Sequence, residues 1–141
     1  MQNKLSHKTG INIGESLPDF TCFDSNKKEI DFLLDENYVL IFVSNYCLYC
    51  IDLLPEIEKI KDVCKKHQLI LFSTGDDEDN TEMQNYFNWK FPIVNLTEEE
   101  MEKYFKVVIH PFCIITNKNK VKQKGIIYNQ KDFIVMYNNL I

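Results

Sequence analysis

Two cysteines with two residues between them, Cys47 and Cys50, follow a continuous apolar run at residues 38–43 and open a stretch with helical spacing. A pair of this spacing could bind a metal, exchange disulfides, reduce a peroxide or pack in a core. The intervening residues, Leu48 and Tyr49, match none of the best-known variants of the motif. The surroundings of the pair must therefore decide between these chemistries.

The position of the pair gives the two thiols different roles. A strand that ends near Asn45 and a helix that starts near Cys47 would place the first thiol at the helix N-terminus. Unpaired backbone N–H groups and the helix dipole stabilise an anion there, so we expect Cys47 to be the exposed nucleophilic thiolate. Cys50, three positions further along, would face the same way as the more buried resolving thiol.

Composition narrows the class of protein. The 141 residues are enough for one domain with a hydrophobic core, and 45% apolar with 26% charged residues is ordinary for a globular protein. The formal net charge of -5 argues against a nucleic-acid partner, because phosphate binding needs clustered positive charge. All sixteen basic residues are lysine.

The start of the chain and its longest apolar run bear on its domain organisation and cellular compartment. Residues 1–12 read as a flexible tail and residues 13–141 as a single domain. The start lacks the apolar core of a signal peptide, and residues 38–43 are too few to span a membrane. We therefore expect a cytoplasmic protein with no membrane span. Its five cysteines are then catalytic, metal-binding or inert rather than a disulfide framework.

Hydrophobic periodicity supplies the elements that position the pair. Residues 49–67 have the spacing of a helix that Pro55 should kink, and Thr97 and Glu100 are spaced as the capping box of another. The other patterns predict strands at 18–23, 38–44 and 69–74, an acidic loop at 75–80, a helix at 81–88, a β-hairpin at 111–128 and a closing helix from 129. This order predicts an α/β fold whose mixed central sheet has helices on both faces.

These features together resemble the thioredoxin family. The resemblance rests on the strand–CxxC–helix, on Pro55 eight residues after Cys47, and on Pro111 ahead of an apolar strand. Residues 14–32 are similar to the extra hairpin of the cytochrome-maturation and peroxiredoxin-related branch. The resemblance covers nearly the whole chain. It implies a thioredoxin fold with an N-terminal β extension.

The resemblance also implies an activity. Cys47 would attack a substrate disulfide and Cys50 would resolve the mixed disulfide, or the same steps would run backwards, without a cofactor. Pro111, in a cis peptide bond beside the pair, would leave neighbouring backbone free for substrate. The family's partners are protein or peptide thiols and disulfides, with a cellular reductant or oxidant. The direction of electron flow stays open.

The residues around the pair suggest the kind of substrate. Tyr46, Leu48, Tyr49 and Phe112 would form an apolar rim, which suits a peptide or an unfolded segment. The chain is also similar to a thioredoxin-like protein encoded with a sporulation-killing-factor peptide. That similarity would make a ribosomally made, bacteriocin-type peptide precursor the substrate.

The chain departs from the family pattern at four positions, one of which is Tyr46 in place of the usual tryptophan before the first cysteine. Ile41 and Leu53 stand where related proteins often carry an acid that takes the proton of the second cysteine. His110 precedes Pro111, where a threonine, isoleucine or valine is more usual. As an imidazolium it would stabilise the Cys47 thiolate, and as a neutral ring it could relay the proton. The alternative is a histidine that points to solvent.

Other functions remain as alternatives. Cys47, Cys50, His110 and Cys113 would make a Cys₃His set for zinc, and a thioredoxin fold can also serve as a non-catalytic interaction protein. Peroxide reduction is disfavoured, because the upstream proline and threonine of peroxiredoxins and any arginine are missing. Cys22, Cys64 and Cys113 are expected to be core residues.

Overall fold

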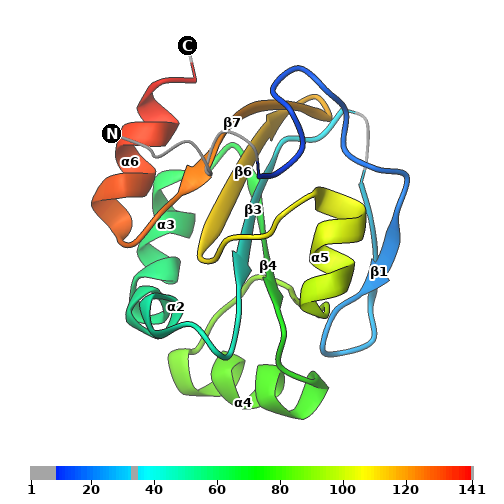
Figure 1. Ribbon diagram of the computed structural model, residues 1–141. Helices are drawn as coiled ribbons and strands as arrows, with labels where there is room; N and C mark the ends of the chain where they lie inside the picture. The colour runs from blue at the N-terminus through cyan, green and yellow to red at the C-terminus, as the bar shows by residue number, and fades with distance from the viewer. Residues whose placement is uncertain (1–8, 33–34, 141) are drawn as a thin grey trace.

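A five-stranded mixed sheet forms the centre of the molecule (Figure 1). The computed structural model describes residues 9–32 and 35–140. The strand order is β5 (Ile93–Asn95), β4 (Gln68–Ser73), β3 (Tyr38–Val43), β6 (Phe112–Asn117) and β7 (Lys120–Ile126). β3, β4 and β5 run parallel, whereas β6 pairs antiparallel with β3 and β7 pairs antiparallel with β6. The expected mixed sheet is confirmed.

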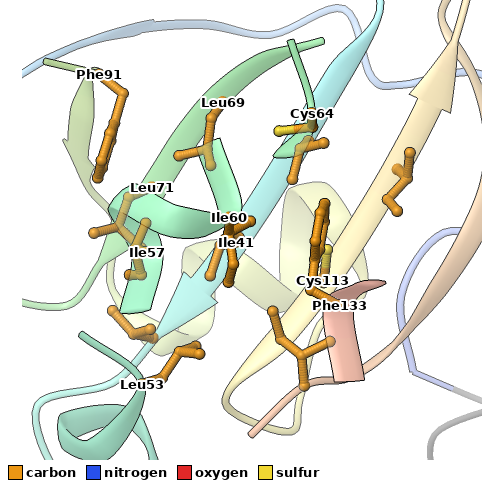
Figure 2. Close-up of a cluster of buried hydrophobic side chains, with 14 of the residues drawn as sticks. Ile41, Leu53, Ile57, Ile60, Cys64, Leu69, Leu71, Phe91, Cys113 and Phe133 are labelled. Atoms are coloured by element: carbon orange, nitrogen blue, oxygen red, sulfur yellow. The ribbon is translucent and has the colours of Figure 1, made fainter. Parts of the chain in front are cut away.

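Helices cover both faces of this sheet, as the sequence predicts. α3 (Ile57–Val63) and α6 (Gln130–Asn138) lie on one face, and α5 (Glu98–Phe105) lies on the other (Figure 1). Because side chains alternate along a strand, β3 supplies both cores: Ile41 joins the first and Phe42 the second. Figure 2 shows the first core, where side chains of the helices gather over the sheet.

The predicted helix after the cysteine pair forms in three pieces. α2 (Leu48–Leu53) leads through a 3₁₀ turn (Leu54–Glu56) into α3, and Pro55 lies in that turn. Proline has no N–H to donate to the helical ladder, so the break occurs where the sequence predicts it. The short α2 keeps both cysteines close to the end of β3.

The prediction that residues 75–80 form an acidic loop is wrong. α4 (Asp77–Phe87) already begins inside this run. Asp76 accepts from the Asp79 N–H at 2.8 Å, and the Asp79 carboxylate accepts from the Asp76 N–H at 3.4 Å. Carboxylates in a first turn are stabilised by the positive end of the helix dipole. The acidic run is therefore a helix start.

Hydrophobic periodicity misses two short strands, one of which the resemblance implies. β5 has three residues, too few for a periodic signal, and Trp89 just before it is buried between Phe87 and Phe91. β2 (Glu29–Asp31) pairs with β1 (Thr21–Phe23) and completes the N-terminal hairpin that the resemblance implied.

The predicted tail at residues 1–12 is wrong over its last part. Residues 1–8 lie outside the described part of the chain, but residues 9–11 are buried. Ile11 belongs to the second core, which explains why these residues are packed. The expectation for the other cysteines is confirmed, since Cys22, Cys64 and Cys113 are all buried.

Candidate active site

Cys47 lies at the N-terminus of α2, four residues beyond the end of β3. Side-chain hydroxyls hold the loop between them: Asn45 N–H donates to Thr74 Oγ1 at 2.8 Å and Tyr46 N–H to Ser44 Oγ at 3.3 Å. Cys47 is the N-cap residue: its Sγ accepts from the Cys50 N–H at 3.3 Å. The Cys47 sulfur therefore lies at the helix N-terminus with a backbone N–H directed at it.

Cys50 has a contrasting environment. Its side chain is 2% exposed, and its Sγ accepts a hydrogen bond from the Ser44 N–H at 3.5 Å. Burial above all, and then the hydrogen bond with Cys47, raise the pKa of the Cys50 thiol. Both cysteines are free thiols in the structure. Cys47 is thus the more accessible thiol and Cys50 the buried one, while their roles as nucleophile and resolving thiol stay predictions.

The surroundings of Cys50 lack the two expected acids. Ile41 and Leu53 are fully buried in the first core. The negative charge of Glu98, in the first turn of α5, contributes the smallest part of the rise in the pKa of the Cys50 thiol. The sequence indicates Glu98 as part of a helix start, but nothing in it places this residue near the pair.

The His110–Pro111 peptide bond is cis, and its segment meets the cysteine pair directly. The contact is made by backbone, because the Cys47 thiol donates to the His110 carbonyl at 3.4 Å. Since Phe42 on β3 is paired with Phe112 on β6, the loops that leave these two strand ends lie side by side. Register therefore brings together residues that are 63 positions apart in the chain.

The ring of His110 points toward α5 rather than into solvent. Its Nε2 lies 3.1 Å from Met101 Sδ, and its Nδ1 lies 3.8 Å from a Glu98 carboxylate oxygen. The side chain is only 7% exposed. Burial lowers the pKa of His110, opposed in part by Glu98, so the ring is neutral at pH 7. The solvent-facing alternative is thus wrong, while tuning of Cys47 by the ring stays a prediction.

An apolar rim surrounds Cys47, although not with all the predicted residues. Tyr46, Leu48 and Tyr49 are exposed, as expected. Phe112 is fully buried in the second core, so its place on the rim is wrong; as the first residue of β6 it turns inward. Tyr128, after β7, extends the rim, with its ring centroid 5.0 Å from that of Tyr49. It is 79 residues away in sequence, and no local pattern connects the two.

A cavity of about 200 Å³ adjoins Cys50 between α2 and α4. Its walls are mainly apolar and are formed by Val43, Ser44, Asn45, Cys50, Ile51, Leu54 and Met83. A larger cavity of about 970 Å³ lies elsewhere, against Tyr38 and Gln68 at the opposite ends of β3 and β4. Of these two cavities, the small one borders Cys50.

The zinc alternative is not supported by the geometry. Within residues 9–32 and 35–140, no group of three or more histidine, cysteine, aspartate or glutamate side chains could hold a metal ion. Cys113 is fully buried in the first core, and its thiol pKa is raised by that burial.

Among residues 9–32 and 35–140, no helix is both long and apolar enough to cross a bilayer.

Comparison with known proteins identifies the fold. Neither a protein-family model nor a curated protein sequence matches the chain. Among solved structures, it is similar to a putative protein disulfide isomerase from Bacteroides thetaiotaomicron, with a TM-score of 0.75, 18% identity, and 92% of this chain and 88% of that one covered. It is also similar to the thioredoxin domain of a thiol-disulfide oxidoreductase from Bacteroides vulgatus (TM-score 0.74, 17% identity, 93% and 99% covered).

A thiol peroxidase from Chromobacterium violaceum shares the same architecture, with a TM-score of 0.68, 15% identity, and 92% and 86% of the two chains covered. These similarities confirm the predicted thioredoxin fold, including its N-terminal hairpin. At such low identity they establish the fold and leave the chemistry to be argued from the residues of the site.

The contrast between the thiols predicts their order of alkylation. At about pH 7.5, iodoacetamide should modify Cys47 first, because it is the accessible thiol at the helix N-terminus. Modification of Cys50 should follow only as the pH is raised, since its raised pKa keeps it protonated and each pH unit increases the thiolate fraction about tenfold. Peptide mapping by mass spectrometry measures both reactions. Equal labelling of Cys47 and Cys64 at neutral pH would contradict the assignment, and Cys47→Ser is the control.

Proposed function

We propose that this protein is a thiol–disulfide oxidoreductase whose reactive pair is Cys47 and Cys50. The observation that carries the proposal is the pairing of a half-buried thiol at a helix N-terminus, in contact with the His110 carbonyl, with a buried thiol 3 residues on. A nucleophile needs access and anion stabilisation, whereas a resolving thiol needs protection until the first bond has formed. The two environments meet these different needs.

The proposed reaction balances as two exchanges. The Cys47 thiolate attacks one sulfur of a substrate disulfide, forming a mixed disulfide, and the other substrate sulfur leaves as a thiolate that takes up a proton. Cys50 then loses its proton and attacks the Cys47 sulfur. The second substrate sulfur is released and protonated, and the Cys47–Cys50 disulfide remains. The substrate gains two electrons from the pair, and a cellular dithiol must restore them; the reverse sequence oxidises a dithiol.

Deprotonation of Cys50 is the difficult step in this sequence. Its pKa is raised mainly by burial, and Ile41 and Leu53 offer no carboxylate to receive the proton. The small cavity that Cys50 lines also borders the exposed residues Asn45 and Ile51. We infer that solvent takes the proton through this cavity. A slow second step would prolong the life of the mixed disulfide.

The rim around Cys47 supports a peptide or protein substrate. Tyr46, Leu48, Tyr49 and Tyr128 present apolar surface to solvent around the reactive sulfur. Burying this surface against an apolar segment beside a substrate cysteine would contribute favourable binding free energy. A small charged thiol such as glutathione would bury little of it and gain little binding free energy. A ribosomally made peptide precursor is one substrate of this class.

Trapping tests the proposed function. With Cys50→Ala, the mixed disulfide on Cys47 cannot be resolved, so a disulfide-bonded peptide should stay covalently attached at near-stoichiometric yield. Non-reducing electrophoresis and mass spectrometry measure the adduct, which dithiothreitol should release. Cys64→Ala is the matched control, because it removes a buried thiol of the same core and should trap nothing. Failure to trap any disulfide, together with stoichiometric zinc in the purified protein, would overturn the proposal.

The rim predicts a preference between substrates. Replacing both Leu48 and Tyr49 by serine should raise the KM for an apolar disulfide peptide about tenfold, since two exposed side chains together supply roughly 1.4 kcal/mol. Turnover of glutathione disulfide should change less than about twofold, because its groups are polar. Steady-state kinetics with both substrates measure the difference. Val135→Ser on α6, another exposed apolar residue, is the control, and an equal loss with both substrates would refute the role of the rim.

The role of His110 is testable through pH. Its lowered pKa means that an imidazolium forms only at acidic pH, so any help to the Cys47 thiolate should be confined to that range. Compared with His110→Ala, the native protein should be alkylated at Cys47 about threefold faster below pH 6, the effect of a weak charge interaction. The two should react alike at pH 8. A rate difference that persists at pH 8 would show that the ring acts in its neutral form.

A further inference from the structure

The N-terminal segment at residues 9–11 binds the loop that leads into the cis-proline. Thr9 is 1% exposed, and its hydroxyl has a partner on each side. It accepts a hydrogen bond from the Val108 N–H at 2.8 Å and donates to the Lys106 carbonyl at 3.2 Å. One buried side chain thus fixes two points of the backbone that runs from the end of α5 to Pro111.

Gly10 bonds the loop at Lys106, as Thr9 does, and also lies against Phe112. Its N–H donates to the Lys106 carbonyl, and its φ of +81° is readily adopted only by glycine. A Cβ here would come within 2.7 Å of the Phe112 ring. Phe112 directly follows Pro111, so the segment contacts the chain on both sides of the cis bond.

Lys124 on β7 secures the segment in turn. Its side chain is buried, and its Nζ donates to the carbonyls of Thr9 and Gly10 at 3.0 and 3.3 Å. Burial lowers the pKa of this amine, with Glu15 opposing the shift. Two carbonyl partners are the expected arrangement for a lysine withdrawn from water. The segment is therefore anchored to the sheet and also attached to the loop.

We propose that Thr9 is a positioning residue for substrate binding, because its hydroxyl fixes the Val108–His110 backbone beside Cys47. The inference rests on the proposed function, since it assumes that a disulfide substrate docks against this loop. Val108 is exposed on its outer side, while its N–H is held by Thr9 on the inner side. The carbonyl of His110, two residues on, contacts the Cys47 sulfur. Without the Thr9 hydroxyl, the loop loses a fixed point within two residues of that contact.

Thr9→Val tests this role, because it removes the hydroxyl and keeps the shape of the side chain. The KM for a disulfide-bonded apolar peptide should rise about tenfold while kcat stays within about twofold, the signature of lost binding rather than lost chemistry. The reaction of Cys47 with the small reagent 5,5′-dithiobis(2-nitrobenzoic acid), which needs no docking loop, should change less than about twofold. Thr9→Ser restores the hydroxyl and should restore the KM.

A structural readout runs in parallel on the same full-length variants. Amide hydrogen exchange of Val108 and Ile109, followed by NMR, should accelerate in Thr9→Val and return toward the native rate in Thr9→Ser. Thr21→Val is the matched control, because the Thr21 hydroxyl bonds Asp31 in the distant β1–β2 hairpin. If Thr9→Val does not fold, Lys124→Met, which loosens the segment through its carbonyls, should give the same pattern.

Several results would overturn the proposal. An equal slowing of the peptide and the small reagent would show a merely structural role for Thr9, as would a Thr9→Ser variant that behaves like Thr9→Val. Unchanged exchange at Val108 would show that the hydroxyl does not hold the loop. If the native protein reacts with the small reagent but with no peptide, the peptide substrate of the proposed function is what fails. In that case the hydrogen-exchange data still test whether the Thr9 hydroxyl holds the loop.

Discussion

The pairing of β3 with both of its neighbours is the constraint on which the site depends. All six residues of β3 are buried, and its backbone is bonded to parallel β4 on one side and antiparallel β6 on the other. The end of such a strand is a fixed point, because moving it would break two ladders at once. α2 starts from this point with the cysteine pair, and β6 starts beside it with Pro111 immediately before its first residue. The cis-proline segment therefore meets Cys47.

Electrostatics and burial then separate two thiols that the motif makes chemically alike. Cys47 accepts a backbone hydrogen bond at a helix N-terminus, whereas Cys50 is withdrawn into an apolar core with Glu98 as an added negative charge. Both influences on Cys50 favour its protonated form. In the proposed reaction, a second thiol that stays protonated would lengthen the life of the mixed disulfide. The exposed aromatic rim is consistent with such a use, since it offers contact area to a bound segment.

The loop before Pro111 is where otherwise distant parts of the chain converge. The loop follows α5 in the chain, and its His110 carbonyl contacts Cys47. On its inner side, the Val108 N–H donates to the buried Thr9 hydroxyl. The His110 ring occupies the space between this loop and α5, so the residue contributes both a backbone contact to the pair and a packed, neutral side chain. A loop constrained from several elements can present its backbone in one position, which is the requirement for docking an extended substrate.

The sequence by itself determined the candidate cysteine pair, the strand before it, the kink at Pro55 and the fold class, because these depend on local spacing and periodicity. It could not assign the acidic start of α4 or the short β5, where the local signal is ambiguous or brief. Only the tertiary structure decided the placement of Glu98, Tyr128 and Thr9 around the site and the inward turn of Phe112. Strand register and the two faces of the sheet decide these placements, and both arise from contacts between residues far apart in the chain.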